Sequence, residues 1–123
     1  MICADTSVWI SFFNGESRSE VVSFEQALTD GTLIMAPPVL AELLSFPKIE
    51  KADIGLVSQL PRLEIKAGYW DRVGNLRKSI LQKGLKARLA DSLIAQSCID
   101  SECALLAIDQ DYRHFAKLGL KFI

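Results

Sequence analysis

Four acidic residues stand in positions that suit metal chemistry. Asp5 and Asp109 each follow a short apolar run. Asp91 and Glu42 lie among small or apolar residues, where a carboxylate is rare unless it is paired or binds a metal. Two carboxylates ~4 Å apart repel by about 4 kcal/mol at an effective dielectric of about 20, so four in one cleft need a counter-ion or raised pKa values. A bound divalent cation meets that need.

The types of the nearby residues narrow the chemistry. An all-oxygen set of ligands selects Mg²⁺ or Mn²⁺, because Zn²⁺ prefers cysteine and histidine. The only histidine, His114, is exposed by pattern and receives no catalytic role, and no cysteine follows a strand into the site. Nucleophilic catalysis by a side chain therefore has little support. Metal-activated water remains, which suits in-line attack on a phosphodiester.

The elements that must position these acids alternate between strands and helices. We predict strands at Ile2–Ala4, Leu33–Ala36, Arg62–Ile65 and Ala104–Ile108, with a further edge strand at Leu120–Ile123. Periodicity and capping residues predict helices at Ser7–Phe13, Arg18–Thr29, Pro37–Leu44, Ile54–Leu60, Tyr69–Leu81, Leu89–Asp100 and Arg113–Leu118. This alternation predicts one domain over residues 1–123, with a three-layer α/β/α fold and a mostly parallel central sheet.

Such a fold brings the acids to one edge. Asp5 and Asp109 end strands, and we expect Asp91 and Glu42 in the first turns of helices, so all four converge at the carboxyl edge of the sheet. Each has a purely structural alternative. Asp5 is also a good helix N-cap, Glu42 could mark the solvent side of its helix, and Asp91 is favoured at a helix N-terminus by about 0.3–1 kcal/mol.

Basic residues gather in the middle of a chain whose net charge is only −1. Residues 62–88 hold eight basic and two acidic residues. In helix Tyr69–Leu81 we expect Gly84 to be the C-cap, and we place the apolar and basic residues on opposite sides: Trp70, Val73, Leu76, Ile80 and Leu81 inward, Arg72, Arg77 and Lys78 outward. This segment, which also holds Lys86 and Arg88, either guides a polyanion to the acids or is a solvated helix face.

The composition excludes several classes of protein. An apolar fraction of 50% and a charged fraction of 24% are globular values, which exclude disorder. The three cysteines lack metal-ligand spacing and are expected to be reduced and buried. The absence of a leader or a membrane-spanning apolar run leads us to expect a cytoplasmic protein.

The four acids lie in motifs that, in this order, resemble those of the PIN-domain ribonucleases, and within them the VapC-type toxins. The resemblance covers the whole chain, and it matches Asp5, Glu42, Asp91 and Asp109 to the family's four acids and Asp111 to an auxiliary one. The matching segments are Asp5-Thr6-Ser7-Val8-Trp9-Ile10, Pro38-Val39-Leu40-Ala41-Glu42-Leu43, Gly84 through Leu89-Ala90-Asp91-Ser92-Leu93-Ile94-Ala95, and Leu105 through Asp109-Gln110-Asp111-Tyr112.

This resemblance implies an endoribonuclease dependent on Mg²⁺ or Mn²⁺, acting as a toxin that a cognate antitoxin neutralises and that pairs as a homodimer. It implies Asp5, Asp91 and Asp109 as metal ligands, with Glu42 as a further catalytic acid. Supporting roles fall to Thr6, Ser7 and Asp111, and the basic segment offers Arg88 and Lys86 for RNA contact. The chain departs from the family's pattern twice: Ala107 stands where a Thr or Ser is frequent, and Tyr112 stands where Phe is commoner.

Other readings of the acids remain open. A phosphorelay receiver and an aspartyl-phosphate phosphatase also gather aspartates at strand ends, and a PIN-like fold can be a non-catalytic binding module. A partner site is expected around four aromatic residues on the first two helices, some of which should be exposed; the alternative is that all belong to the core. These residues are Trp9, Phe12, Phe13 and Phe24.

Overall fold

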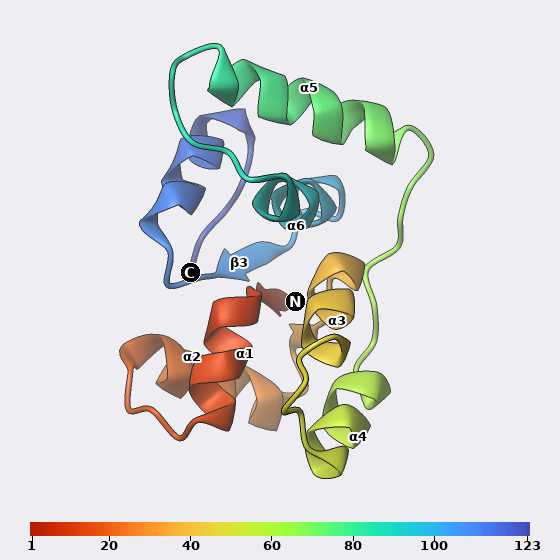
Figure 1. Cartoon of the computed structure of the whole chain (residues 1–123), viewed down its shortest axis with the longest axis vertical. Coiled ribbons are helices and arrows are strands. Elements are labelled where there is room, and N and C mark those ends of the chain that lie inside the picture. The colour runs from red at the N-terminus through yellow and green to blue at the C-terminus, as the bar shows by residue number, and fades with distance from the viewer.

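The computed structural model describes residues 1–123 as a small parallel sheet surrounded by helices (Figure 1). The strands are β1 (Ile2–Ala4), β2 (Leu33–Ile34) and β3 (Ala104–Leu106), and the sheet order is β2-β1-β3. The helices are α1 (Thr6–Phe13), α2 (Ser19–Asp30), α3 (Pro37–Leu44), α4 (Lys51–Gln59), α5 (Tyr69–Leu81), α6 (Leu89–Asp100) and the 3₁₀ helix η1 (Gln110–Leu118).

Strand β1 is the centre of the sheet and carries the chain into the site. It pairs in parallel with both neighbours, Ile2 opposite Leu33 and Cys3 opposite Leu105. Beyond the strand, the Asp5 N–H still donates to the Leu106 carbonyl at 2.9 Å. Because all three strands run the same way, their carboxyl ends meet at one edge, and this last bond fixes Asp5 there.

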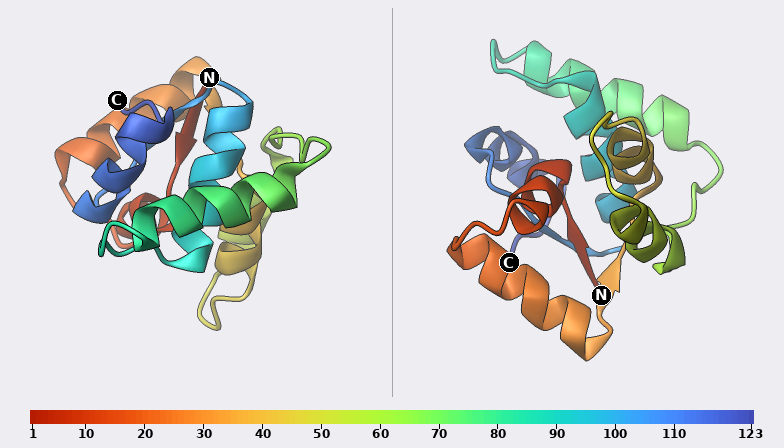
Figure 2. Two further views of the ribbon diagram at one scale, coloured as in Figure 1. Left: turned by 90° about the horizontal axis from the view of Figure 1, so that it is seen from above. Right: turned by 60° about the horizontal axis from the view of Figure 1, so that its bottom comes forward.

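Helices cover the sheet from both sides. In Figures 1 and 2, α5 and α6 lie on one side of the strands and α1 and α2 on the other. Helix α6 is buried over most of its length, as its small and apolar composition predicts, and it packs against β3, α3 and α5. The layered α/β fold with a parallel sheet is therefore confirmed.

Helix α5 has the predicted bounds, but two of its residues face the other way. Trp70 and Leu81, expected inward, are 69% and 44% exposed, whereas Tyr69 is buried. Trp70 and Leu81 lie outside the buried stripe of the helix, which repeats at helical spacing and consists of Tyr69, Val73, Leu76 and Ile80. A bond from the Tyr69 hydroxyl to the Leu93 carbonyl of α6 at 2.6 Å holds Tyr69 inward. The helix ends at Leu81 with Gln82 as its C-cap, and the left-handed Gly84 lies two residues further on.

Two predicted strands are reduced to single bridges. In the segment Arg62–Ile65, only Arg62 forms a bridge, to Met35, and only Leu63 is buried. A strand is stabilised by packing of its side chains on neighbouring strands and helices, and a segment with one buried side chain has little such packing. At the end of the chain, Phe122 forms a single bridge to Leu105, so Leu120–Ile123 is not a full edge strand.

The four early aromatic residues pack on one another. Trp9 and Phe24 are fully buried, with ring centroids 4.7 Å apart and nearly perpendicular rings. Phe12 and Phe13 are partly buried against the same core. The core alternative is therefore the correct one for Trp9 and Phe24. None of the helices combines the length and the apolar character needed to cross a bilayer.

Candidate acidic site at the carboxyl edge of the sheet

Asp5 is held by bonds at both of its carboxylate oxygens. As the N-cap of α1, it accepts a bond from the Ser7 N–H at 3.4 Å and one from the Ser7 hydroxyl at 2.7 Å, both at Oδ2. The Tyr112 hydroxyl donates to Oδ1 at 2.7 Å. The side chain is only 6% exposed, so these bonds fix its orientation.

Tyr112 joins Asp5 to a second acid. Its hydroxyl also lies 3.1 Å from Asp91 Oδ1, so the two carboxylates face the same phenol. Tyr112 comes from η1 and is 1% exposed, while Asp91 lies in the first turn of α6. Three elements distant in the sequence therefore meet at this point.

The electrostatics of the pair follow from this geometry. Burial raises the pKa of Asp91, and the charges of Asp5 and Asp109 raise it further, against the opposing effects of the Tyr112 hydroxyl and the Arg88 guanidinium. Burial and the charge of Asp5 raise the pKa of Tyr112 well above its usual range, so the phenol stays protonated. Both shifts express one fact: negative charge is crowded here and poorly hydrated.

Asp109 and Asp111 stand beside this pair without joining it by a hydrogen bond. Asp109 is the N-cap of η1 and accepts a bond from the Asp111 N–H at 2.8 Å. Two residues, Ala107 and Ile108, separate the end of β3 from Asp109. Its charge nevertheless contributes to the raised pKa of Asp91.

Glu42 is placed differently from our expectation. It lies in the second turn of α3, whose first turn holds no acid, and it is exposed. The bounds of α3 are those predicted, but Glu42 is its sixth residue, and one turn of an α-helix holds only 3.6 residues. Its carboxylate still points toward α1, where the Thr6 hydroxyl donates to Oε1 at 2.7 Å. Thr6 and Ser7 thus each hold one acid.

The oxygen atoms of the site are ligands that a hard divalent cation prefers. The carboxylates of Asp5 and Asp91 converge, and every nearby ligand atom is oxygen, the preference of Mg²⁺ and Mn²⁺. No three acids, cysteines or histidines lie close enough together to hold an ion jointly. The four-acid cluster is therefore not assembled in this arrangement, because Tyr112 links Asp5 to Asp91 while Glu42 is held at Thr6.

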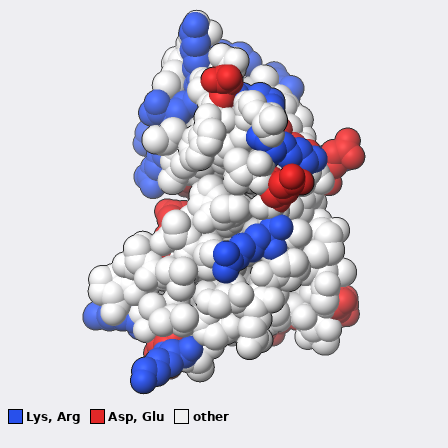
Figure 3. Space-filling model, turned by 90° about the vertical axis from the view of Figure 1, so that its right-hand side faces the viewer, with Lys and Arg blue, Asp and Glu red and all other residues white.

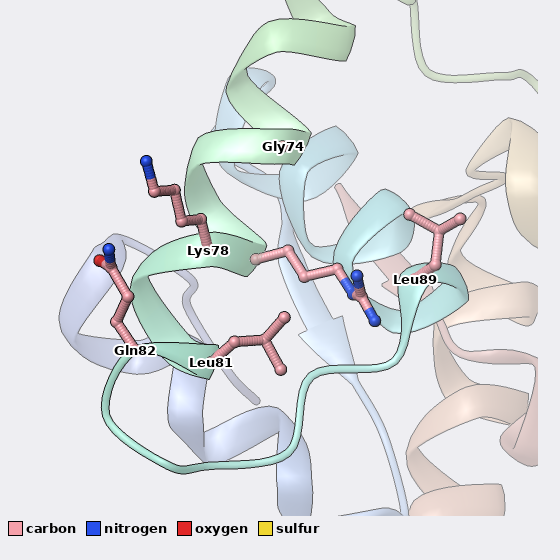
Figure 4. Close-up of a pocket in the computed structure, with 6 residues that line it drawn as sticks. Gly74, Lys78, Leu81, Gln82 and Leu89 are labelled. Atoms are coloured by element: carbon pink, nitrogen blue, oxygen red, sulfur yellow. The ribbon is translucent and has the colours of Figure 1, made fainter.

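A basic pocket lies next to the start of α6. Its volume is about 440 Å³, and Figure 4 shows Leu81 of α5 and Leu89 of α6 on its two sides. Arg77 lines it and donates through Nε to the Ala87 carbonyl at 2.8 Å. In Figure 3, lysine and arginine side chains gather over the upper part of the molecule, where α5 lies. The remaining lining residues are Gly74, Lys78 and Gln82.

Lys86 and Arg88 belong to the loop that leads into α6, whose first residue, Leu89, lines this pocket. Both are exposed, and Arg88 is the N-cap of α6, three residues before Asp91. The Lys86 carbonyl bonds His114 Nδ1 at 2.9 Å, which ties the loop to η1. The cationic loop is thus anchored beside the acidic pair, with its charged groups free to meet solvent.

Sequence reasoning missed the residue that links the acids. It noted Tyr112 only as a departure from a pattern and gave it no role. A signal was available, since Tyr112 follows Asp109 by three residues, one turn of a 3₁₀ helix, and so returns to the side of the helix that holds the cap.

The fold and the site define an α/β protein with a cluster of acids at the carboxyl edge of a parallel sheet. The chain matches the PIN domain family over residues 2–118 and belongs to it. No match was found among the curated proteins.

Solved structures share this fold over the full length of the chain. VapBC2 from Rickettsia felis, bound to a DNA fragment from their promoter, is 24% identical with a TM-score of 0.73, covering 100% of this chain and 98% of that chain. DNA-bound VapBC from Salmonella typhimurium is 17% identical with a TM-score of 0.72, covering 99% and 96%. FitAcB from Neisseria gonorrhoeae is 16% identical with a TM-score of 0.68, covering 100% and 96%.

Proposed function

We propose that the chain, as one domain over residues 1–123, is a metal-dependent endoribonuclease and the toxin of a toxin–antitoxin pair. The observation that carries the proposal is the convergence of the Asp5 and Asp91 carboxylates on one point at the carboxyl edge of a PIN fold. Membership of the PIN family favours this function over a phosphorelay receiver or a phosphatase. The intact set of acids favours it over a binding module without catalysis.

The acids divide the work. Asp5, Asp91 and Asp109 would hold Mg²⁺ or Mn²⁺, and Glu42, held by Thr6, supplies a fourth carboxylate. Ser7 keeps Asp5 in one rotamer, and the Asp111 N–H does the same for Asp109. When bound, such a cation activates water and offsets charge on the phosphate. The protein's part is to keep these oxygens oriented in a partly dehydrated site.

The acids are tested by charge removal. Asp5→Asn, Asp91→Asn and Asp109→Asn should each abolish RNA cleavage in Mn²⁺ buffer while the thermal melt shows a folded protein. Asp111→Asn should have a smaller effect, because only its backbone reaches Asp109. Asp71→Asn is the control: Asp71 is the third residue of α5, as Asp91 is of α6, but it is exposed and remote from the acids. Full activity in an Asp5, Asp91 or Asp109 variant removes that residue from the site.

RNA would approach along the cationic loop. Arg88 precedes Asp91 by three residues and its charge acts on that carboxylate, so a strand that contacts Arg88 and Lys86 would bring its backbone to Asp91. The pocket that Arg77 and Lys78 line also reaches the first residue of α6, Leu89. Each lost phosphate contact should reduce the slope of log affinity against log salt by about 0.7 for single-stranded RNA. Arg88→Ala and Lys86→Ala should show this reduction, while Lys121→Ala, an exposed lysine at the C-terminal end, should not. Affinity independent of salt would mean that the segment is a solvated face.

An apolar hollow is the best surface for the antitoxin. Trp70 is 69% exposed and lines a hollow of about 260 Å³ with Pro37, Pro38, Ile65, Tyr69 and Leu93. Solved structures with this fold are VapBC and FitAB assemblies, which supports a small protein partner here.

The partner is tested by co-expression with the neighbouring reading frame. The chain alone should inhibit growth, and the product of that frame should silence it and co-purify. Trp70→Ala should weaken co-purification and leave RNA cleavage unchanged, with Val22→Ala, another exposed apolar residue, as its control. Light scattering on the 13.6 kDa chain tests the homodimer. A dimer that Trp70→Ala dissociates would assign the hollow to a second copy instead.

A further inference from the structure

The phenol of Tyr112 occupies the place where the two best-positioned acids meet. Its hydroxyl donates to Asp5 Oδ1 at 2.7 Å and lies 3.1 Å from Asp91 Oδ1. A phenol has a single proton to give, and Tyr112 is only 1% exposed. The single phenol proton is therefore shared between two carboxylates that repel each other.

We propose that Tyr112 is a positioning residue that pairs Asp5 with Asp91 and competes with the metal ion for their oxygens. The inference rests on the proposed metal-dependent function. It follows from one atom: Asp5 Oδ1 accepts the shorter bond from the phenol, and a cation that binds both acids competes for that oxygen. The other oxygen of Asp5 is no substitute, because Ser7 already donates to it twice.

The packing around Tyr112 shows why the phenol stays in place. Its ring lies in the hydrophobic core and contacts Phe115, with centroids 6.1 Å apart. The hydroxyl is therefore presented to the acids by η1 as a rigid group. A cation has to displace a fixed bond, so the phenol sets a threshold on metal affinity.

The competition predicts a linked pair of effects in Tyr112→Phe. Without metal, the variant should melt about 5 °C lower, because it loses a hydrogen bond to charged groups. In Mn²⁺ titrations followed by calorimetry, it should bind about tenfold more tightly, because the ion no longer displaces that bond. The two melting temperatures should then converge at saturating Mn²⁺, since the bond is absent from both loaded proteins.

Tyr69→Phe is the matched control. Tyr69 is also 1% exposed, and its hydroxyl bonds the Leu93 carbonyl at 2.6 Å instead of a carboxylate. Its variant should melt lower with and without Mn²⁺ and bind the ion with wild-type affinity. A general effect of losing a buried hydroxyl would appear in both variants; competition appears only at Tyr112.

The outcomes separate this inference from the proposed function. Weaker or unchanged Mn²⁺ binding in Tyr112→Phe, with clear binding in the wild type, overturns the competition and leaves the nuclease proposal standing. Binding in neither protein at millimolar Mn²⁺ overturns both. Mn²⁺ binding in Tyr112→Phe but not in the wild type would mean that the phenol excludes the ion, and it supports the competition.

Discussion

Replacing Asp91 by asparagine should stabilise the metal-free protein. The two hydrogen bonds of the Tyr112 hydroxyl, 2.7 Å and 3.1 Å long, limit the distance between Asp5 Oδ1 and Asp91 Oδ1 to about 5.8 Å at most. Two unit charges at that separation repel by about 3 kcal/mol at an effective dielectric of about 20. Asp91 is half-buried, so solvent screens part of this repulsion. The substitution also loses about 0.3–1 kcal/mol of favourable interaction with the N-terminus of α6 and weakens the bond from Tyr112.

The net expectation for Asp91→Asn is a gain of about 1 kcal/mol, or about 4 °C in the melting temperature at pH 7. The gain depends on pH in a defined direction. Because the folded-state pKa of Asp91 is raised, the wild type takes up a proton on acidification and loses the repulsion. The advantage of the variant should therefore be present at neutral pH, shrink as the pH falls through the raised pKa, and vanish below about 4.

Thermal melts from pH 4 to 8 measure this, with Asp71→Asn reporting the loss of an equivalent charge at the start of α5. That control should be slightly destabilised, since it loses the dipole interaction and relieves no close acid pair. A destabilised Asp91→Asn with an unchanged pH profile would refute the reasoning. It would mean that the attraction of Arg88 and the bond from Tyr112 outweigh the repulsion from Asp5.

Three further substitutions test other parts of the structure. Asp100→Asn should destabilise the protein by about 1 kcal/mol at neutral pH, because the Arg72 guanidinium bonds both carboxylate oxygens of Asp100. The same guanidinium holds the pKa of Asp100 below its usual range, so melts in acid should show this stabilisation lost as the pH falls through the lowered pKa. Phe24→Ala should cost about 3–5 kcal/mol in urea unfolding, since Phe24 is fully buried against Trp9. In a Trp9→Phe background the emission of Trp70 should lie near that of solvated tryptophan and shift to shorter wavelength when the antitoxin binds; an unchanged spectrum in a stable complex would place the partner elsewhere.

The local signals in the sequence were sufficient for most of the fold. Asp5 was readable as the end of a strand and the cap of a helix, and α5 and α6 were readable from their periodicity and composition. The orientation of Trp70 was readable too but was misjudged, because the stripe that begins at Tyr69 and runs through Val73, Leu76 and Ile80 leaves Trp70 outside. The bond from Tyr69 to the Leu93 carbonyl was not readable, because it joins residues 24 apart.

The candidate site shows the same division. Strand ends and helix starts indicated that Asp5 and Asp91 would meet. Glu42 was assigned to the wrong turn of α3, although the bounds of that helix were predicted correctly. The role of Tyr112 depended on a contact across most of the chain, between its hydroxyl and the carboxylate of Asp5. Composition shows that crowded acids need a partner, and only packing shows which partner they have.

The bond between Tyr112 and Asp5 joins residues 107 positions apart, and β1 also depends on β3 for one of its two neighbours. During synthesis, the first five residues emerge long before their partners exist. The central strand must therefore wait, paired on one side at most, until about a hundred further residues have been made. Parallel pairing over such separations forms slowly, because the chain loses loop-closure entropy before the strands gain any contact energy. Completion of the acidic site is consequently among the last events of folding, and a chain cut short before η1 holds Asp5 and Asp91 but has no phenol to join them.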